Sequence, residues 1–219
     1  MSNYKISLIK IIFIALSFFL LAILINTTIA CINNSHWLVL YKNHFYISFL
    51  IQSFIQVLLY LGLVFLWLKN TKMNFEEIGF RIPKIKSLII WSVVTLVLSF
   101  AYEILNLHYG KFSFKPIDDY LKLIYYTSIY ILPLSLIEEI IFRGLIYTLF
   151  EKRFGALIAV VSQAILFTMI HWQRYSLLGT LLLLFFAGLI YGLGRLKTKS
   201  IIPGMIAHSA NNIFSTIVR

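Results

Sequence analysis

Charged residues are scarce in this 219-residue sequence. Asp, Glu, Lys and Arg make up only 12% of it, whereas hydrophobic residues make up 60%. Soluble domains are close to half apolar and about a quarter charged. So few charges do not supply enough polar surface to cover a globular protein in water, which excludes an ordinary soluble domain. The sequence therefore predicts an integral membrane protein.

Cysteine and acidic residues are also rare. The single cysteine, Cys31, excludes an intramolecular disulfide and a cysteine-based metal cluster. Eight acidic residues against 19 Lys and Arg give a formal net charge of +11. The basic residues lie in short clusters between apolar blocks, as is typical of cytoplasmic loops. The sequence has no basic face interleaved with aromatic residues, the pattern that would indicate nucleic-acid binding. We expect the lipid bilayer, and no nucleic acid, as a partner.

Long apolar runs are what the sequence has in abundance. A membrane-spanning helix needs about 20 mostly apolar residues. Seven candidate segments cover roughly residues 8–31, 45–68, 88–107, 120–150, 155–173, 176–195 and 200–217. No fixed-period repeat, low-complexity segment or long linker divides the chain. We expect an all-α, polytopic transmembrane bundle of about seven spans, forming a single integral membrane domain over residues 1–219.

The distribution of Lys and Arg predicts an orientation for this bundle. With seven spans and a cytoplasmic N-terminus, twelve of the 19 basic residues fall on the cytoplasmic side and six on the outer side. The remaining one, Arg143, falls within the membrane. Cytoplasmic loops are enriched in Lys and Arg, so the pattern favours an N-terminus inside the cell.

Three segments of the second half place polar groups inside apolar runs. They are "EEIIFR" from Glu138, "FTMIH" ending at His171, and "PGMIAHSANN" ending at Asn212. Ionisable groups cost a few kcal/mol each within a membrane and usually face a polar interior. Because residues four apart share a helix face, Glu139 and Arg143 are predicted to pair. Glu138 points about 100° away from Glu139 and is left free for chemistry.

Depth in the membrane predicts that these segments form one site. His208 and Asn212 are four residues apart and share a helix face. At about 1.5 Å of rise per residue, Glu138 lies ~24 Å and His171 ~26 Å from the turn near residue 154. His208 and Asn212 lie ~15 Å and ~21 Å from the next loop on the same side. Similar depth on three helices indicates a shared buried site.

Such a site can hydrolyse a peptide bond in two ways. A carboxylate with a histidine can deprotonate water, while histidine and asparagine donors stabilise the tetrahedral oxyanion. Alternatively, Glu138, His171 and His208 can bind one divalent metal, such as zinc, that activates the water. The HExxH signature of common zinc proteases is absent. The residues leave both routes open, so the cofactor is either none or one divalent metal.

Together these motifs resemble the CPBP intramembrane proteases, which include CAAX prenyl endopeptidases and bacterial homologues. The residues that carry the resemblance are EExxxR at Glu138–Arg143 followed by Gly144, FxxxH at Phe167–His171, and HxxxN at His208–Asn212. The resemblance covers about residues 130–217 and implies an intramembrane endopeptidase. Its substrate would be a peptide or a membrane protein, and its catalytic core would occupy about residues 120–217.

The resemblance also implies residue roles. These are water activation by Glu138 with help from His171, oxyanion binding by His208 and Asn212, and support of the site by Glu139 and Arg143. The two histidines are only 37 positions apart, which indicates a compact bacterial member and argues against a prenylated CAAX substrate. We therefore expect a multi-pass protein of the bacterial cell membrane.

Other functions remain open from the sequence. A non-enzymatic bacteriocin immunity protein or membrane scaffold could retain the motifs without turnover. Separately, Glu139 and Arg143 could be only a buried structural ion pair that holds helices together, which is compatible with catalysis by Glu138. A transporter would show inverted repeats in both halves, whereas these polar positions lie in one half. Gly188 and Gly192 have the spacing of close helix packing, either within the bundle or in a dimer.

Overall fold

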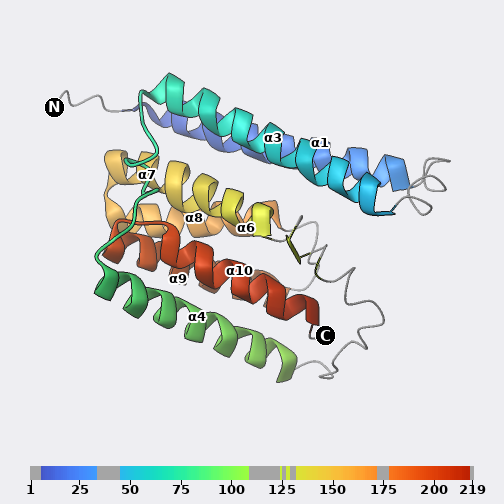
Figure 1. Cartoon of the computed structure of the whole chain (residues 1–219). Coiled ribbons are helices and arrows are strands. Elements are labelled where there is room, and N and C mark those ends of the chain that lie inside the picture. Colours follow the sequence, from blue (N-terminus) through green and yellow to red (C-terminus); the bar gives the residue numbers. More distant parts are fainter. Residues whose placement is uncertain are drawn as a thin grey trace.

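The computed structural model describes residues 6–33, 45–108, 124, 127–128, 132–171 and 178–217. The described segments are almost entirely helical (Figure 1). In chain order they are α1 (Leu8–Asn33), α3 (Phe45–Thr71), α4 (Ile85–His108), α6 (Leu132–Glu139), the π-helix η2 (Ile140–Ile146), α7 (Tyr147–Phe154), α8 (Ala156–Ile170), α9 (Leu178–Thr198) and α10 (Ile202–Ile217). The predicted all-α helical bundle is confirmed.

The predicted spans coincide with these helices to within a few residues at most ends. The exception is the fourth span, where α6, η2 and α7 follow one another over residues 132–154. Most of the predicted part before residue 132 lies outside the described residues. Within the described chain, the helices long and apolar enough to cross a membrane cover Leu8–Thr28, Leu50–Thr71 and Leu181–Thr198. The chain is an integral membrane protein.

Apolar and polar side chains are distributed as expected for a protein in lipid. Ile9 on α1 and Ile85 on α4 expose 80% and 68% of their surface. In contrast, Glu139, Arg143 and Gln163 are completely buried. Without water in the bilayer core, polar groups must find their partners inside the bundle, and the interior of this bundle is where they gather.

The polar interior lies between the α1–α3 hairpin and α4. α1 and α3 form a hairpin on one side of the bundle, and α4 lies on the opposite side against α10 and α9 (Figure 1). α8 packs closely on α9, where a Cβ added to Gly188 would lie 3.0 Å from Cα of Ala164. Gln163 reinforces this contact by donating to the Gly188 carbonyl at 2.7 Å. Within this chain, the small-residue spacing therefore serves packing inside the bundle.

A loop at one end of the bundle, residues 72–84, ties its helices together. Gly79 has a positive φ of 87° and its carbonyl accepts a 2.9 Å hydrogen bond from the Ile201 amide. Its missing Cβ makes room for Arg195, whose Nε would otherwise be 2.6 Å away. Arg81 Nε donates to the Lys199 carbonyl at 3.1 Å. The loop is thereby docked on the turn between α9 and α10.

Candidate active site

Glu138 lies close to the histidines of the other two sequence motifs. Its Oε1 lies 3.9 Å from Nε2 of His171, and its Oε2 lies 3.5 Å from Nε2 of His208. These side chains come from α6, the C-terminal end of α8 and α10. The predicted common depth of the three segments is therefore realised as contact between side chains.

Glu139, the neighbouring carboxylate, is enclosed on every side. Its Oε1 lies 3.0 Å from Nη1 of Arg143 and 2.9 Å from Nδ1 of His208. A Cβ added to Gly204 would stand 2.5 Å from its Oε2. The predicted pair with Arg143 is present, and both side chains are 0% exposed, whereas Glu138 is 24% exposed. Only one of the two adjacent carboxylates is therefore reachable.

Aromatic rings surround the buried guanidinium and position the imidazoles. Arg143 Cζ lies 4.2 Å from the centre of the Phe167 ring and 5.0 Å from that of Tyr191. Cation–π contacts of this kind stabilise a charge that has left water. Tyr191 also stacks on His208, with ring centres 5.4 Å apart and planes 22° apart. Ser99 donates to the Tyr191 hydroxyl at 3.0 Å, so α4 contributes to the same network.

Asn212 is joined to the helix that bears Glu138. Its Nδ2 donates a 2.9 Å hydrogen bond to Oγ of Ser135, one turn before Glu138 on α6. Ser135 is fully buried. The structure thus places Asn212 beside α6, the helix that bears Glu138.

The hydrogen-bond partners of the two histidines indicate their tautomers. Nδ1 of His171 lies 2.8 Å from the Phe167 carbonyl. Because a carbonyl only accepts, that nitrogen carries the proton. Nδ1 of His208 faces the carboxylate of Glu139 in the same way. In their neutral forms, both rings present the lone pair of Nε2 towards Glu138.

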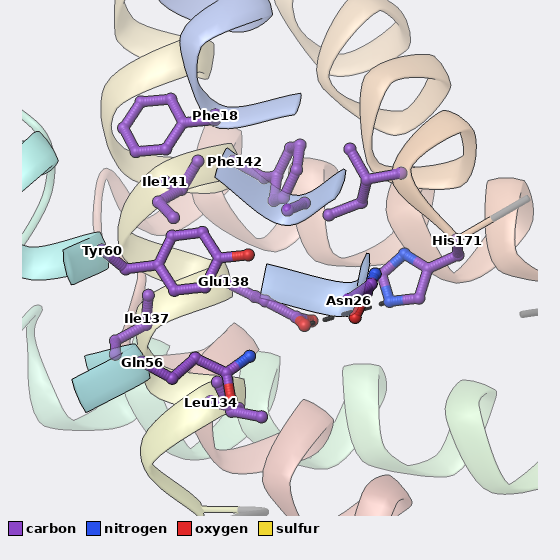
Figure 2. Close-up of a pocket in the computed structure, with 12 residues that line it drawn as sticks. Phe18, Asn26, Gln56, Tyr60, Leu134, Ile137, Glu138, Ile141, Phe142 and His171 are labelled. Atoms are coloured by element: carbon purple, nitrogen blue, oxygen red, sulfur yellow. Dashed lines mark ion pairs between the residues drawn. The ribbon is translucent and has the colours of Figure 1, made fainter. Parts of the chain in front are cut away.

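A cavity of about 110 Å³ opens onto Glu138 and His171. Figure 2 shows the two side chains in this pocket, joined by the dashed ion pair. The other lining residues are Phe18, Ala22, Asn26, Gln56, Tyr60, Leu134, Ile137, Ile141, Phe142 and Ile170. The cavity has room for a small number of water molecules, and the α1–α3 hairpin supplies one of its walls.

The helix that carries the two glutamates widens immediately after them. Residues Ile140–Ile146 form a π-helix in which every side chain is buried. π-helical turns are rare and occur frequently at functional sites. Here the Arg143 carbonyl accepts a 3.2 Å hydrogen bond from Nε of Arg195, whose Nη2 also reaches the Glu77 carbonyl at 3.3 Å. Arg195 therefore connects the widened turn to the 72–84 loop.

The sequence leaves open a divalent metal held by Glu138, His171 and His208. Within the described residues, no three His, Cys, Asp or Glu side chains are grouped so that they could hold an ion. Oε1 of Glu138 lies 3.9 Å from Nε2 of His171. Nδ1 of His208 is engaged by Glu139, which leaves Nε2 of that ring facing Glu138.

Several residues of the site carried no recognised signal in the sequence. Tyr191, Ser135 and Ser99 belong to apolar runs in which single polar residues are common. Gln56 lies in α3, outside any motif. Helical spacing could have identified only Ser135, which is three residues before Glu138 and shares its face.

Fold and site together define a polytopic helical membrane protein with a buried glutamate–histidine centre. Residues 120–214 match the family model described as type II CAAX prenyl endopeptidase Rce1-like. This segment belongs to that family, which confirms the resemblance to the CPBP proteases and supports a function of the intramembrane protease type. No curated protein and no solved structure matches the chain significantly.

Proposed function

We propose that this protein hydrolyses peptide bonds inside the membrane, using a water molecule activated by Glu138. One observation carries the proposal. Of two adjacent carboxylates, Glu139 is fully enclosed by Arg143, His208 and Gly204, while Glu138 faces a cavity and lies near two imidazoles. A carboxylate kept open in this way is suited to accept a proton from water.

The attack begins with a water molecule in the cavity. Glu138 accepts one proton from it, and the lone pair of His171 Nε2 accepts a hydrogen bond from its other O–H, which orients the oxygen. That oxygen forms a bond to the carbonyl carbon of the substrate, and the π electrons move onto the carbonyl oxygen. When the intermediate collapses, the C–N bond breaks and Glu138 passes its proton to the leaving amine. The products are a carboxylic acid and an amine.

His208 and Asn212 stabilise the oxyanion in this scheme. His208 already donates Nδ1–H to Glu139, so it donates from Nε2 only as an imidazolium. Donors placed around a developing oxyanion in a site poor in water commonly provide the largest share of catalysis.

The cationic end of the bundle supports the predicted orientation in the membrane. Lys152, Lys199 and Arg81 lie at the end that includes the 72–84 loop, where Lys152 pairs with Glu77 and Lys199 with Glu151. The positive-inside rule favours this end in the cytoplasm, which also puts the N-terminus there. The bacterial membrane and the peptide or membrane-protein substrate stay predictions from the sequence.

The test is cleavage of a synthetic peptide pool by the purified protein in detergent, with products mapped by mass spectrometry. The wild type is compared with Glu138→Gln and with Glu76→Gln, which makes the same change at an exposed glutamate of the 72–84 loop. Each is assayed with and without a chelator. We expect turnover in the wild type and Glu76→Gln, at least a hundredfold loss in Glu138→Gln, and no effect of the chelator.

Two results would contradict this scheme. Loss of turnover with the chelator and recovery with zinc would replace the metal-free mechanism by one in which Glu138, His171 and His208 bind an ion. An absence of turnover in a wild-type sample shown to be folded would favour the immunity or scaffold function. In that case, Glu138→Gln should leave the cellular phenotype of the protein intact.

A further inference from the structure

Gln56 is a buried amide that points into the candidate active site from outside the family segment. It lies on α3 and lines the same cavity as Glu138 and His171 (Figure 2). Its side chain is only 8% exposed, and its Oε1 is buried with no hydrogen-bond partner among the described residues. An unpaired amide oxygen is unfavourable in an interior without bulk water, and a ligand in the cavity that supplies a donor would satisfy it.

We propose that Gln56 binds the backbone of the substrate peptide next to the scissile bond, with Oε1 accepting a hydrogen bond from a peptide N–H. This rests on the proposed function. A segment cleaved within the membrane must leave its helix, and its N–H and C=O groups then lose their partners. A glutamine amide offers one acceptor and two donors, the same kinds of group that a neighbouring β-strand would offer an extended peptide.

The cavity limits what Gln56 can reach. At about 110 Å³ it holds only a small number of water molecules. A peptide group hydrogen-bonded to Gln56 therefore lies within a residue or so of the carbonyl facing Glu138. The α1–α3 hairpin would in this way set the register of the substrate, whereas the Rce1-like segment, residues 120–214, supplies the chemistry.

The lining of the cavity favours an uncharged ligand. Glu138 is an acid, and neither Lys nor Arg is among the lining residues. A lipid phosphate would meet the carboxylate without a compensating cation, and like charges in a poorly screened site repel strongly. A peptide backbone carries no charge and supplies the N–H that Oε1 lacks, which makes it the occupant that fits.

Gln163 provides a matched control for the test. It is also a buried glutamine in a membrane helix, but its Nε2 donates to the carbonyls of Val160 and Gly188 at 2.9 and 2.7 Å. Gln163 is thus a structural amide that joins α8 to α9. Replacing it with leucine removes two hydrogen bonds, together with an Oε1 that, like that of Gln56, is buried with no partner among the described residues. The same replacement of Gln56 removes a buried, unpaired oxygen from the wall of the cavity.

The experiment compares Gln56→Leu with Gln163→Leu in three measurements. Thermal unfolding in detergent is expected to be unchanged or raised for Gln56→Leu and lowered for Gln163→Leu. On a peptide that the wild type cleaves, Gln56→Leu is expected to raise KM about three- to tenfold with a smaller change in kcat. Methylating the substrate N–H that faces Gln56 should weaken cleavage by the wild type but not by Gln56→Leu.

Other results would overturn the assignment. Destabilisation of Gln56→Leu comparable to that of Gln163→Leu would make Gln56 a structural amide. An unchanged KM in a stable Gln56→Leu protein would mean that the amide binds only water. If the wild type cleaves nothing, the proposed function fails. The peptide-binding role of Gln56 is then tested separately, by measuring how a fluorescein-labelled version of the peptide pool binds to Glu138→Gln and to the double variant Glu138→Gln/Gln56→Leu. Equal binding by the two proteins refutes the subsite.

Discussion

His208 and Glu139, 69 positions apart in the chain, are joined by a 2.9 Å contact between Nδ1 and Oε1. The contact fixes the proton of the imidazole on Nδ1 and turns Nε2 towards Glu138, 3.5 Å away. Because Glu139 is held in turn by Arg143, a single buried carboxylate positions a histidine on α10 and compensates an arginine on η2. The pair of Glu139 and Arg143 that was inferred from the sequence therefore also links the α6–η2 segment to α10.

Breaking this arrangement at Glu139 should destabilise the protein strongly. Glu139→Gln leaves Arg143 as an uncompensated charge with no exposed surface. We expect a loss of about 3–5 kcal/mol in unfolding free energy, the usual penalty for removing one partner of a buried pair. The measurement is denaturant or thermal unfolding in detergent.

The double variant Glu139→Gln/Arg143→Met tests the cause of that loss. Removing both charges leaves no buried ion to solvate, and buried pairs replaced by apolar residues are often nearly neutral in stability. We expect the double variant to be more stable than Glu139→Gln alone. If the double variant is instead less stable than Glu139→Gln alone, the charge imbalance is not what destabilises the single variant.

Gly204→Ala tests the packing of α10 on Glu139. The new Cβ would stand 2.5 Å from Oε2 of Glu139, so the carboxylate has to move away from His208. We expect lower stability and lower peptide turnover. Gly62→Ala on α3 is the matched control, because an added Cβ there meets nothing within 4 Å. Alanine in place of a helical glycine should stabilise that variant by about 0.5–1 kcal/mol. Equal effects at both positions would contradict the close contact.

Arg195→Met should loosen the 72–84 loop. The guanidinium donates to the carbonyls of Arg143 and Glu77 and to Oγ1 of Thr148, and methionine makes none of these bonds. We expect faster cleavage of the loop in limited proteolysis and a destabilisation of about 2–4 kcal/mol, because charged hydrogen bonds contribute about 1.5–3 kcal/mol each and not additively. Lys197→Met, an exposed position on the same helix, should leave the proteolysis rate unchanged.

The pair of Lys152 and Glu77 predicts a small dependence of stability on pH. The hydrogen bond from Lys152 is the main cause that lowers the pKa of Glu77 below its ordinary value. A lowered carboxyl pKa contributes stability above the unfolded-state pKa and loses it as the pH falls through the folded-state pKa. Both side chains are 41% exposed, so the contribution is at most about 1 kcal/mol.

Lys152→Met isolates this contribution. Its stability deficit relative to the wild type should be present at neutral pH, shrink as Glu77 becomes protonated in acid, and diminish in high salt. Unfolding of both proteins measured between neutral and acidic pH checks this. A deficit that grows on acidification would have the wrong sign for a lowered pKa.

Much of the fold could be read from the sequence because the signal is local. A stretch of about 20 apolar residues is a helix across a membrane whatever its neighbours are, so the boundaries of α1, α3, α9 and α10 were predicted closely. The pair of Glu139 and Arg143 was equally predictable, since helical spacing alone brings residues four apart together. The π-helix at Ile140–Ile146 was not predicted, because its apolar pattern is the same as that of an α-helix.

The sequence by itself determined the class of protein, the helices, and the polar and ionisable residues that three of these helices carry within apolar segments. Only the tertiary structure decided that Glu139 also contacts His208, that Tyr191 stacks on His208, and that Gln56 reaches the cavity from α3. The physical reason is that hydropathy and helical spacing act along one helix. Contacts between helices depend instead on their rotation and tilt, which are set by the packing of the whole bundle.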